Sequence, residues 1–433
     1  MNAEPKDWTC DRLKDVSAIN VFSLPADTDS DYEFDYLEIS NVNYHGIVDP
    51  SAIERLRYED APSRARRRLS EGCTAISSVR PNLQAVAFIE NDPGDLVCST
   101  GFNVVQPAAH KLSPKFAYYA LLADGARQYF EATAKGVGYP AVDDKDFQAF
   151  SIPLPPVSEQ QRITAYLDAS CAAIDAAVAA KRRQLETLDA VRESIVETAI
   201  TRGMDARPEL SSIDQDWIGS LPEHWMAARV KRVIARMDYG ISVSSGPEGK
   251  FPVLKMGNIQ AGEIVFSKIE FVDEVSDELL LQTNDLLYNR TNSPDQVGKA
   301  ALFRGTKDDA ITFASYLVRL RHNHRIIPEF LNYAVNCGGF LAFARRLAVP
   351  SVQQSNLNST RYGRMLVPLP PVSEQHMICE YLASKVGNLK SVVATIQSQI
   401  ATLIAYRQSL IHECVTGQRR ITDADINRIA AHG

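Results

Sequence analysis

Apolar residues recur at steps of three and four along two stretches of the chain. In the first stretch they are Ile174, Val178, Leu185, Leu188, Ile195 and Ala199. In the second they are Leu389, Val393, Ile396, Ile400, Leu403, Leu410 and Cys414. This spacing puts the apolar side chains in one narrow stripe, as in a coiled coil. The pattern predicts two helices of roughly 40 residues, each on the order of 60 Å long at about 1.5 Å per residue.

Three basic residues, Lys181, Arg192 and Arg407, share the stripe with these apolar positions. Polar residues on a coiled-coil seam fix the register of one pair of helices. A single amphipathic helix packed on a globular core would also show a stripe. The length of the two stretches and the narrowness of the stripe favour helices that pack on each other.

The chain also repeats itself. The eight residues from Pro153 to Gln160 recur identically from Pro368 to Gln375. The match continues downstream, where Ile163, Tyr166 and Leu167 correspond to Ile378, Tyr381 and Leu382. Upstream it is weaker, between residues 36–42 and 253–259. A match of this length within one chain indicates an internal duplication.

The repeated segment predicts where each globular part ends. Its two consecutive prolines can neither continue a strand ladder nor lie inside a helix. Ser158 and Ser373 are then expected to cap the two helices, and the first copy has the better capping box because Gln161 follows three residues later. The predicted domains are 1–152 (head 1), 153–203 (first helix), 204–367 (head 2), 368–418 (second helix) and 419–433 (tail).

Each head is expected to mix helices and strands. Residues 84–90 and 311–320 are rich in strand formers, whereas residues 115–131 and 328–347 show helical patterns. The connection over residues 204–222 is too short to return a helix to its starting end, so the two helices are expected to run antiparallel. The predicted fold class is α+β, with two mixed α/β heads separated by two long antiparallel coiled-coil helices and a pseudo-twofold internal repeat.

The composition is that of a globular protein, with 45% hydrophobic and 23% charged residues. The seven cysteines are scattered, which favours reduced thiols in a cytoplasm over disulfides or a cysteine zinc site. The first residues have no apolar core of a signal peptide. Apolar runs such as residues 172–180 are too short to predict a membrane span.

A second motif precedes head 2, where residues 216–225 read DWIGSLPEHW. This motif resembles the entry to a target-recognition domain of the specificity subunits of type I restriction–modification enzymes. Two heads, each followed by a PLPP-x-x-EQ segment and a long helix, resemble the same family over nearly the whole chain. Head 1 has only a looser entry, Asp7-Trp8 and then Arg12-Leu13-Lys14, which leaves its first strand less defined.

The resemblance implies a protein without catalytic activity of its own. Each head would contact one half of a split target in double-stranded DNA, and the helices would set the spacing and dock two methyltransferase subunits. Endonuclease–translocase subunits would join where the system also cuts DNA. S-adenosylmethionine, ATP and Mg would be bound by these partners, and this chain would hold no cofactor or metal. The net charge of −7 fits partners that neutralise much of the DNA charge.

Head 2 has the clearer candidates for DNA contact. No Asp or Glu occurs from Phe330 to Ser373. Arginine suits phosphate or guanine, and glutamine or asparagine suits adenine. The candidates are Arg290, Asn292, Arg345, Arg346, Gln353, Gln354, Ser355 and Arg361. A solvated polar loop is the alternative interpretation of this stretch.

Head 1 has fewer donors in the corresponding places. Its candidates are Arg80, Asn82, Lys135 and Tyr139. The dense basic cluster of Arg64, Arg66, Arg67 and Arg68, with Arg55 and Arg57 upstream, is diluted by Glu54, Glu59 and Asp60. It favours phosphate contact slightly over an exposed helix face. A salt-bridged surface arginine is the alternative for Arg80 and for Arg290.

The motifs of the catalytic partners are absent. Residues 246–250 resemble a P-loop only superficially, because Phe251 stands where a Ser or Thr would bind the metal. The sequence contains neither G-x-G-x-x-G nor the Pro-Pro-aromatic motif of amino-methyltransferases. His322-Asn323-His324 and Pro294-Asp295 each match only fragments of nuclease motifs.

The alternative function is an adaptor, in which two ligand-binding modules sit on a coiled-coil spacer that dimerises with another copy. Such a protein would need no DNA. It would expose apolar seams on its helices for a second chain, whereas Lys181, Arg192 and Arg407 favour one pair within the chain.

Overall fold

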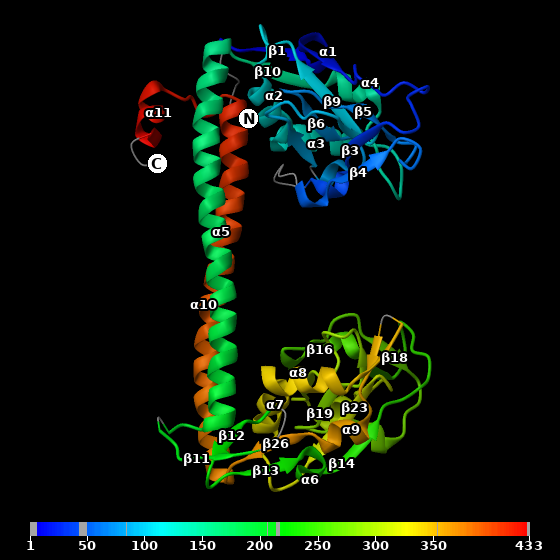
Figure 1. Ribbon diagram of the computed structural model, residues 1–433, viewed down its shortest axis with the longest axis vertical. Helices are drawn as coiled ribbons and strands as arrows, with labels where there is room; N and C mark the ends of the chain where they lie inside the picture. The colour runs from blue at the N-terminus through cyan, green and yellow to red at the C-terminus, as the bar shows by residue number, and fades with distance from the viewer. Residues whose placement is uncertain are drawn as a thin grey trace. The chain divides into compact units, whose positions relative to one another are not determined.

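The computed structural model describes residues 7–42, 50–83, 85–205, 207–213, 217–352 and 354–430. The chain divides into two compact units. Unit 1 is Met1–Arg182 with Gln397–Gly433, and unit 2 is Arg183–Ile396. Each unit contains one head and one half of each long helix (Figure 1).

The two long helices are α5 (Val157–Arg202) and α10 (Val372–Val415). In unit 1, Lys181 Nζ donates to Gln399 Oε1 at 2.7 Å, and Arg407 Nε lies 3.1 Å from Asp175 Oδ1. Residue numbers rise along one helix as they fall along the other, so the helices run antiparallel. In unit 2, residues near the end of α5 share a core with residues near the start of α10. The predicted antiparallel pairing of two long helices is confirmed within each unit.

Burial along the predicted stripe is uneven. Ile174, Val178, Ile396 and Leu410 are buried. The other predicted pairing residues are half-buried, namely Leu185, Leu188, Ile195, Leu389, Val393, Ile400 and Leu403. Three of the four buried residues, Ile174, Val178 and Leu410, lie in the head 1 core.

Both helices begin one residue before the serines expected to cap them. The Pro156 carbonyl accepts hydrogen bonds from the N–H groups of Glu159 (2.8 Å) and Gln160 (3.0 Å). Ser158 and Ser373 are exposed inside the first turns. The predicted serine caps are therefore wrong, because the residue preceding each helix is a proline whose carbonyl starts the helical hydrogen bonding.

Head 1 is built on two four-stranded sheets. One has the order β2 (Ser17–Ile19), β9 (Phe102–Pro107), β6 (Thr74–Ser77) and β7 (Val86–Phe88). The other has the order β4 (Glu54–Arg57), β3 (Glu33–Leu37), β8 (Leu96–Ser99) and β5 (Ala65–Arg68). The entry strand β1 (Thr9–Arg12) pairs antiparallel with the exit strand β10 (Ser151–Leu154). The helices are α1 (Leu13–Val16), α2 (Pro114–Leu122), α3 (Asp124–Thr133) and α4 (Asp144–Ala149).

Head 2 repeats the entry and exit pairing, with β13 (Met226–Arg229) antiparallel to β26 (Leu366–Leu369). Its main sheet has the order β14 (Ile234–Tyr239), β23 (Leu317–His322), β19 (Leu286–Asn289), β21 (Ala300–Leu302), β17 (Gly262–Ile264) and β16 (Ile259–Gln260). Two smaller sheets are β18 (Glu270–Val272), β15 (Phe251–Leu254), β22 (Thr312–Phe313) and β20 (Thr291–Asn292), β25 (Gln354–Asn356), β24 (Val349–Ser351). A further pair, β11 (Leu210–Ser212) and β12 (Ser220–Pro222), precedes β13. The helices are α6 (Val230–Val233), α7 (Pro328–Asn336), α8 (Gly338–Leu347) and α9 (Ser359–Arg364).

The predicted helical stretches 115–131 and 328–347 are each two helices. Ala123 separates α2 from α3, and Cys337 separates α7 from α8. Both residues have extended backbones, with φ −70° and ψ 152° at Ala123 and φ −68° and ψ 153° at Cys337. The break at the same place in both heads is a further sign of the duplication.

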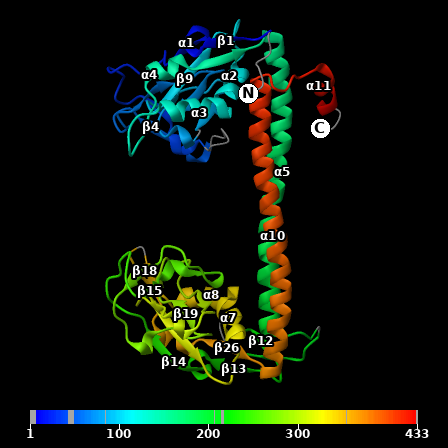
Figure 2. The same ribbon diagram turned by 180° about the vertical axis from the view of Figure 1, so that it is seen from behind.

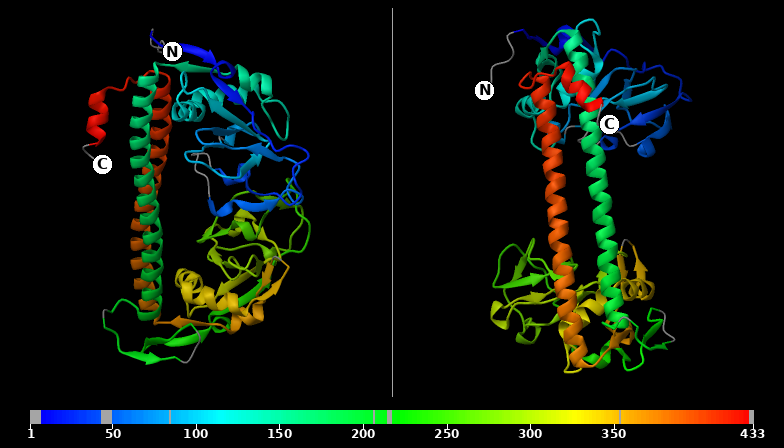
Figure 3. Two further views of the ribbon diagram at one scale, coloured as in Figure 1. Left: turned by 45° about the horizontal axis from the view of Figure 1, so that its top comes forward. Right: turned by 90° about the vertical axis from the view of Figure 1, so that its left-hand side faces the viewer.

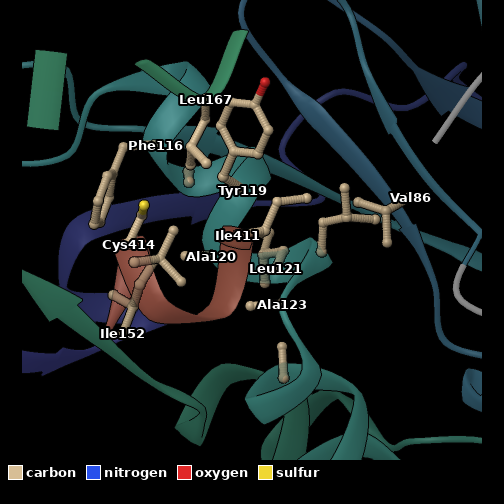
Figure 4. Close-up of a cluster of buried hydrophobic side chains, with 14 of the residues drawn as sticks. Val86, Phe116, Tyr119, Ala120, Leu121, Ala123, Ile152, Leu167, Ile411 and Cys414 are labelled. Carbon is tan, nitrogen blue, oxygen red and sulfur yellow. The ribbon is translucent and has the colours of Figure 1, made fainter. Parts of the chain in front are cut away.

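The paired helices are part of the head cores. In head 1, α2 lies between the strands and α5 (Figure 2), and Asp168 of α5 accepts from Lys115 Nζ (2.9 Å) and Tyr119 Oη (2.8 Å). Side chains of α2, β10, α5 and α10 meet in one cluster, including Phe116 and Cys414 (Figure 4). The stripe on these helices therefore serves two purposes at once, since it packs on the partner helix and on a head.

Helix α5 is long and apolar enough to cross a membrane by length and composition alone, which the shorter runs in the sequence did not indicate. Its apolar residues Ile163, Leu167, Cys171, Ile174 and Val178 are buried in the head 1 core. The core helix of a globular domain passes the same test. The packing of α5 therefore explains its apolar composition.

Candidate nucleic-acid interface

Each head is joined to its long helix by the glutamine of the repeated octapeptide. Gln160 Oε1 accepts from Ser113 N at 2.7 Å, and its Nε2 donates to the carbonyls of Lys111 (2.8 Å) and Pro155 (2.8 Å). Gln375 makes the same three contacts, accepting from Ile327 N (2.7 Å) and donating to the carbonyls of Arg325 (3.0 Å) and Pro370 (2.9 Å). Both side chains are fully buried. The repeated Gln is thus a positioning residue, which the sequence signalled only through its identity in the two copies.

The glutamate before each glutamine binds the entry tryptophan of its head. Trp8 Nε1 donates to Glu159 Oε2 at 3.3 Å, and Trp225 Nε1 donates to Glu374 Oε2 at 2.9 Å. Trp8 is therefore the counterpart of Trp225, and the looser entry of head 1 has the same architecture as that of head 2. The two glutamates differ in the partner of their other carboxylate oxygen. In head 2 this partner is His224, whose Nε2 lies 2.9 Å from Glu374 Oε1.

In unit 1 the chain that follows α10 takes the place of that histidine. Arg420 Nε lies 3.1 Å from Glu159 Oε1, and its two terminal nitrogens donate to Asp7 at 2.9 and 2.7 Å. These hydrogen bonds lower the pKa of Asp7. Ile421 is buried nearby, and helix α11 (Asp423–Ala430) lies across the paired helices from the head 1 sheets (Figure 3).

In head 2 the two candidate stretches meet in the sheet of β20, β25 and β24. Thr291 of β20 pairs with Asn356 of β25, which also pairs with Val349 of β24. Leu357 N donates to the Arg290 carbonyl at 2.8 Å. This small sheet and its loops are called the head 2 clip. Residues 291–292 and 354–356, from the two sequence stretches, thus lie in one sheet.

Two buried tyrosines support the head 2 clip. The rings of Tyr288 and Tyr362 stack with centroids 3.8 Å apart and planes 8° from parallel. Tyr288 Oη donates to the Leu357 carbonyl at 3.3 Å, so the stack is tied directly to the clip. Burial raises the pKa of both phenols, which are structural groups.

Head 1 has a smaller version of this arrangement. Ala141 bridges to Val79 on one side and to Lys135 on the other, and Arg80 N donates to the Pro140 carbonyl at 2.7 Å. The Arg80 guanidinium stacks on the exposed Tyr139 ring, 4.4 Å from its centroid. The sequence placed these residues in two separate stretches, and the fold brings them into one head 1 clip.

An arginine–tyrosine stack also occurs in head 2, with the Arg290 guanidinium 5.0 Å from the ring centroid of Tyr239. Tyr239 Oη lies 2.8 Å from Ser359 Oγ, and Arg290 Nη1 donates to the Ser315 carbonyl at 3.2 Å. Among the residues that the structure describes, buried Arg290 Nε finds no hydrogen-bond partner. Sequence reasoning missed Tyr239, because it lies far from both candidate stretches along the chain.

The remaining head 2 candidates are placed differently. Gln354 and Arg361 are exposed, and Arg361 Nη1 donates to the Leu347 carbonyl at 3.0 Å. Arg345 Nη2 donates to the Asp295 carbonyl at 2.7 Å, and Arg346 stacks on Phe343.

Two head 2 candidates are less available than the sequence suggested. Ser355 is only 6% exposed inside the clip, so its hydroxyl is withdrawn from the surface. Asn292 is half-buried and accepts from Ser293 N at 2.8 Å. Gln353 lies outside the described residues.

The cations of head 1 are largely neutralised. Lys135 Nζ lies 2.6 Å from Asp143 and 3.2 Å from Asp146, and these hydrogen bonds raise its pKa. The basic cluster around residues 55–68 forms ion pairs with carboxylates through Arg55, Arg57, Arg64 and Arg68. Among the head 1 candidates, exposed Arg80 and Asn82 keep donors near the clip. The predicted helix face is wrong, because these arginines lie on or beside strands β4 and β5.

Potential metal ligands are dispersed over the described part of the chain. No group of three or more His, Cys, Asp or Glu residues is arranged there to hold a metal ion. The cysteines are free thiols, and burial raises the pKa of Cys337 and of Cys414 to about 12. Thiols with such pKa values are poor nucleophiles at neutral pH.

Known proteins that specify DNA targets resemble this chain in sequence. Residues 5–187 match the family model described as the type I restriction modification DNA specificity domain. The specificity subunit of the type I restriction enzyme MjaVIII of Methanocaldococcus jannaschii is 24% identical over 300 residues, 68% of this chain and 68% of its own length. The EcoKI specificity subunit of Escherichia coli is 22% identical over 303 residues, 67% of this chain and 62% of its own length. The MjaX specificity subunit of M. jannaschii is 25% identical over 205 residues, 46% of this chain and only about half (47%) of its own length.

Solved structures share the fold. A chain from a structure of a type I R-M system covers 96% of this chain and 99% of its own, with 20% identity and a TM-score of 0.75. The HsdS subunit of Thermoanaerobacter tengcongensis covers 96% and 98%, with 20% identity and a TM-score of 0.50. The likeness to these two solved structures is one of fold. The predicted resemblance of the chain to specificity subunits of type I restriction–modification systems is confirmed.

Proposed function

We propose that this chain is the non-catalytic subunit that reads DNA sequence for a type I restriction–modification complex. Each head reads one half of a bipartite target in double-stranded DNA. The observation that carries the proposal is the duplicated clip, since both heads present an arginine stacked on an exposed tyrosine, Arg80 on Tyr139 and Arg290 on Tyr239. Arginine reads guanine through two hydrogen bonds, and a stacked guanidinium keeps its donors in one plane.

The partners follow from the same duplication. Two copies of one helix–head junction, at Gln160 and at Gln375, supply two similar docking surfaces for two methyltransferase subunits. Endonuclease–translocase subunits join where the system also cuts. These partners bind S-adenosylmethionine, ATP and Mg, and the chain itself holds no cofactor. Its site of action is the cytoplasm, where free cysteines stay reduced.

The pairing of α5 with α10 favours this function over a self-dimerising adaptor. The seams of the two helices face each other inside one chain, through contacts such as Arg407 with Asp175 and Lys181 with Gln399. An adaptor would need those seams for a second copy.

Methylation mapping tests the proposal. The chain is expressed with a methyltransferase partner, and the modified motif is mapped before and after replacement of Leu13–Phe150 by another head. This exchange keeps both β1 and β10, whose pairing joins the head to α5. The expected result is a split motif of which only one half changes. An absent motif, or one indifferent to the exchange, contradicts the proposal and favours the adaptor.

A further inference from the structure

Two short helices of head 2 carry exposed cations and no acidic residue. Helix α6 contributes Lys231 and Arg232, and α9 contributes Arg361 and Arg364. All four side chains are exposed. None of the four takes part in an ion pair with a residue that the structure describes. We call these four residues the α6–α9 surface.

An open hollow of about 360 Å³ lies between α6, β14 and α9. Its lining includes Lys231, Arg364, Thr360 and Ser359, whose hydroxyl lies 2.8 Å from Tyr239 Oη. Arg236 also lines it, but Asp238 (2.7 Å) and Glu278 (2.8 Å) balance that charge. The hollow thus combines two unbalanced cations with hydroxyl donors, which are the groups that bind phosphate oxygens.

The packing of α6 on α9 keeps this hollow in shape. A Cβ placed on Gly363 would lie 3.4 Å from Lys231 Cβ and 3.6 Å from Met237 Cε. These are ordinary van der Waals distances, so α9 packs closely on α6 and β14 at Gly363.

The α6–α9 surface adjoins the head 2 clip. Helix α9 follows directly after the clip, and Ser359 at its first position contacts Tyr239, on which Arg290 stacks. A backbone phosphate at the hollow would therefore belong to the same nucleic acid whose bases face Arg290.

Head 1 lacks this surface. Its corresponding helices, α1 and α4, pack on each other as α6 and α9 do. They carry Lys14 and Lys145 but also Asp15, Asp144 and Asp146. Asp15 pairs with Arg12, and Asp146 with Lys135. The difference between the heads is therefore one of charge on a shared framework.

We propose that the α6–α9 surface of head 2 binds the phosphodiester backbone of duplex DNA, and that head 1 makes no such contact. This inference rests on the proposed DNA-reading function. Head 2 then supplies more of the salt-dependent binding, whereas head 1 depends on its clip. In a chain with net charge −7, a local cluster of this kind gives an acidic protein a place to hold DNA.

The test uses the full chain with its methyltransferase partner and a duplex that carries the mapped target. One variant combines Lys231→Gln with Arg364→Gln. The matched control combines Lys14→Gln with Lys145→Gln, which removes the same charge from head 1. Binding is measured across a salt series, with thermal unfolding midpoints as a check on folding.

The head 2 variant should reduce the slope of log Kd against log salt by about two, because each phosphate contact contributes about 0.9. Affinity at 0.1 M salt should fall about tenfold for each lost contact, with the methylated motif unchanged. The head 1 control should leave both quantities unchanged. Equal effects in the two variants, an unchanged slope, or an altered motif in the head 2 variant would overturn the inference while leaving the DNA-reading function intact. If the unaltered complex shows no preference for its target, the proposed function itself fails.

Discussion

The two heads stabilise the same strand pairing differently, head 2 with a buried ion pair and head 1 with neutral hydrogen bonds. In head 2, Asp238 of β14 lies opposite Arg319 of β23, and Arg319 is fully buried. Arg319 Nη2 donates to Asp238 Oδ2 at 2.6 Å, and its Nη1 donates to the Leu280 carbonyl at 3.0 Å. In head 1 the corresponding place after β2 belongs to Asn20, which exchanges hydrogen bonds with the backbone of Val104.

A second polar contact shows a similar difference between the heads. Arg321 of head 2 binds the buried Asp285 with two hydrogen bonds of 2.7 Å. In head 1, Gln106 and Ser70 make one hydrogen bond of 2.8 Å. A duplicated framework therefore tolerates either a buried ion network or neutral hydrogen bonds, as long as every partner is supplied. In the charged version, the loss of one residue costs more stability, because it leaves a buried charge without its partner.

The largest expected effect comes from breaking the charged version. Asp238→Ala leaves the buried Arg319 with only the more distant Asp285 carboxylate, at 3.7 Å, and should destabilise head 2 by about 3 kcal/mol. The matched change in head 1, Asn20→Gly, removes only neutral hydrogen bonds at a residue with positive φ (56°), and should cost about 1 kcal/mol. Hydrogen exchange followed by mass spectrometry assigns each loss to its head. Equal losses would show that charge does not distinguish the two networks.

The same carboxylate gives head 2 an acid sensitivity. Burial raises the pKa of Asp238, but the hydrogen bonds from Arg319 and Arg236 lower it by more. The pKa of Asp238 in the folded protein is therefore below its ordinary value of 3.8. Because the folded pKa is below the unfolded one, this stabilisation is complete above about pH 4 and is lost as the pH falls through the folded pKa. Exchange protection of β14 and β23 should therefore fall in this range. Asp238→Asn should remove that part of the dependence.

A smaller effect is expected where the heads are alike. Gln160→Leu and Gln375→Leu each leave a buried backbone N–H and two carbonyls unpaired, and each should cost about 2–3 kcal/mol in its own unit. Ser158→Ala and Ser373→Ala are the controls and should change stability by less than about 0.5 kcal/mol, since both serines are exposed and neither caps its helix. Serine variants as damaging as the glutamine variants would restore the capping interpretation.

The smallest difference concerns the two basic seam residues that the duplication relates. Arg407 is 7% exposed and binds Asp175 across the helix pair, whereas Arg192 binds only Asp189 on its own helix. Arg407→Ala should cost about 1–2 kcal/mol through lost packing and pairing. Arg192→Ala should cost less than about 0.5 kcal/mol. Thermal unfolding of the two variants side by side measures the contrast, and indistinguishable midpoints would contradict it.

Sequence reasoning found the helices and the duplication because both are local or repeated signals. It missed the functions of Gln160 and Glu159, since a buried side chain that satisfies a distant backbone looks like any polar residue in a helix. It also assigned Ser355 to the surface, because a strand of alternating polar residues gives no sign of which face is covered. Tyr239 was missed for a different reason, because its partners Arg290 and Ser359 are far away along the chain.

The sequence by itself determined the order of head, helix, head and helix, because periodicity and proline placement act within a few residues. It also determined the family resemblance, because the motifs that carry it are short and continuous in the sequence. Only the tertiary structure decided which cations are free and which are neutralised, since Lys135 and Lys231 differ in their neighbours across space and not along the chain. Electrostatic balance depends on distances between folded elements, and these distances are set only when the strands pair and the helices pack.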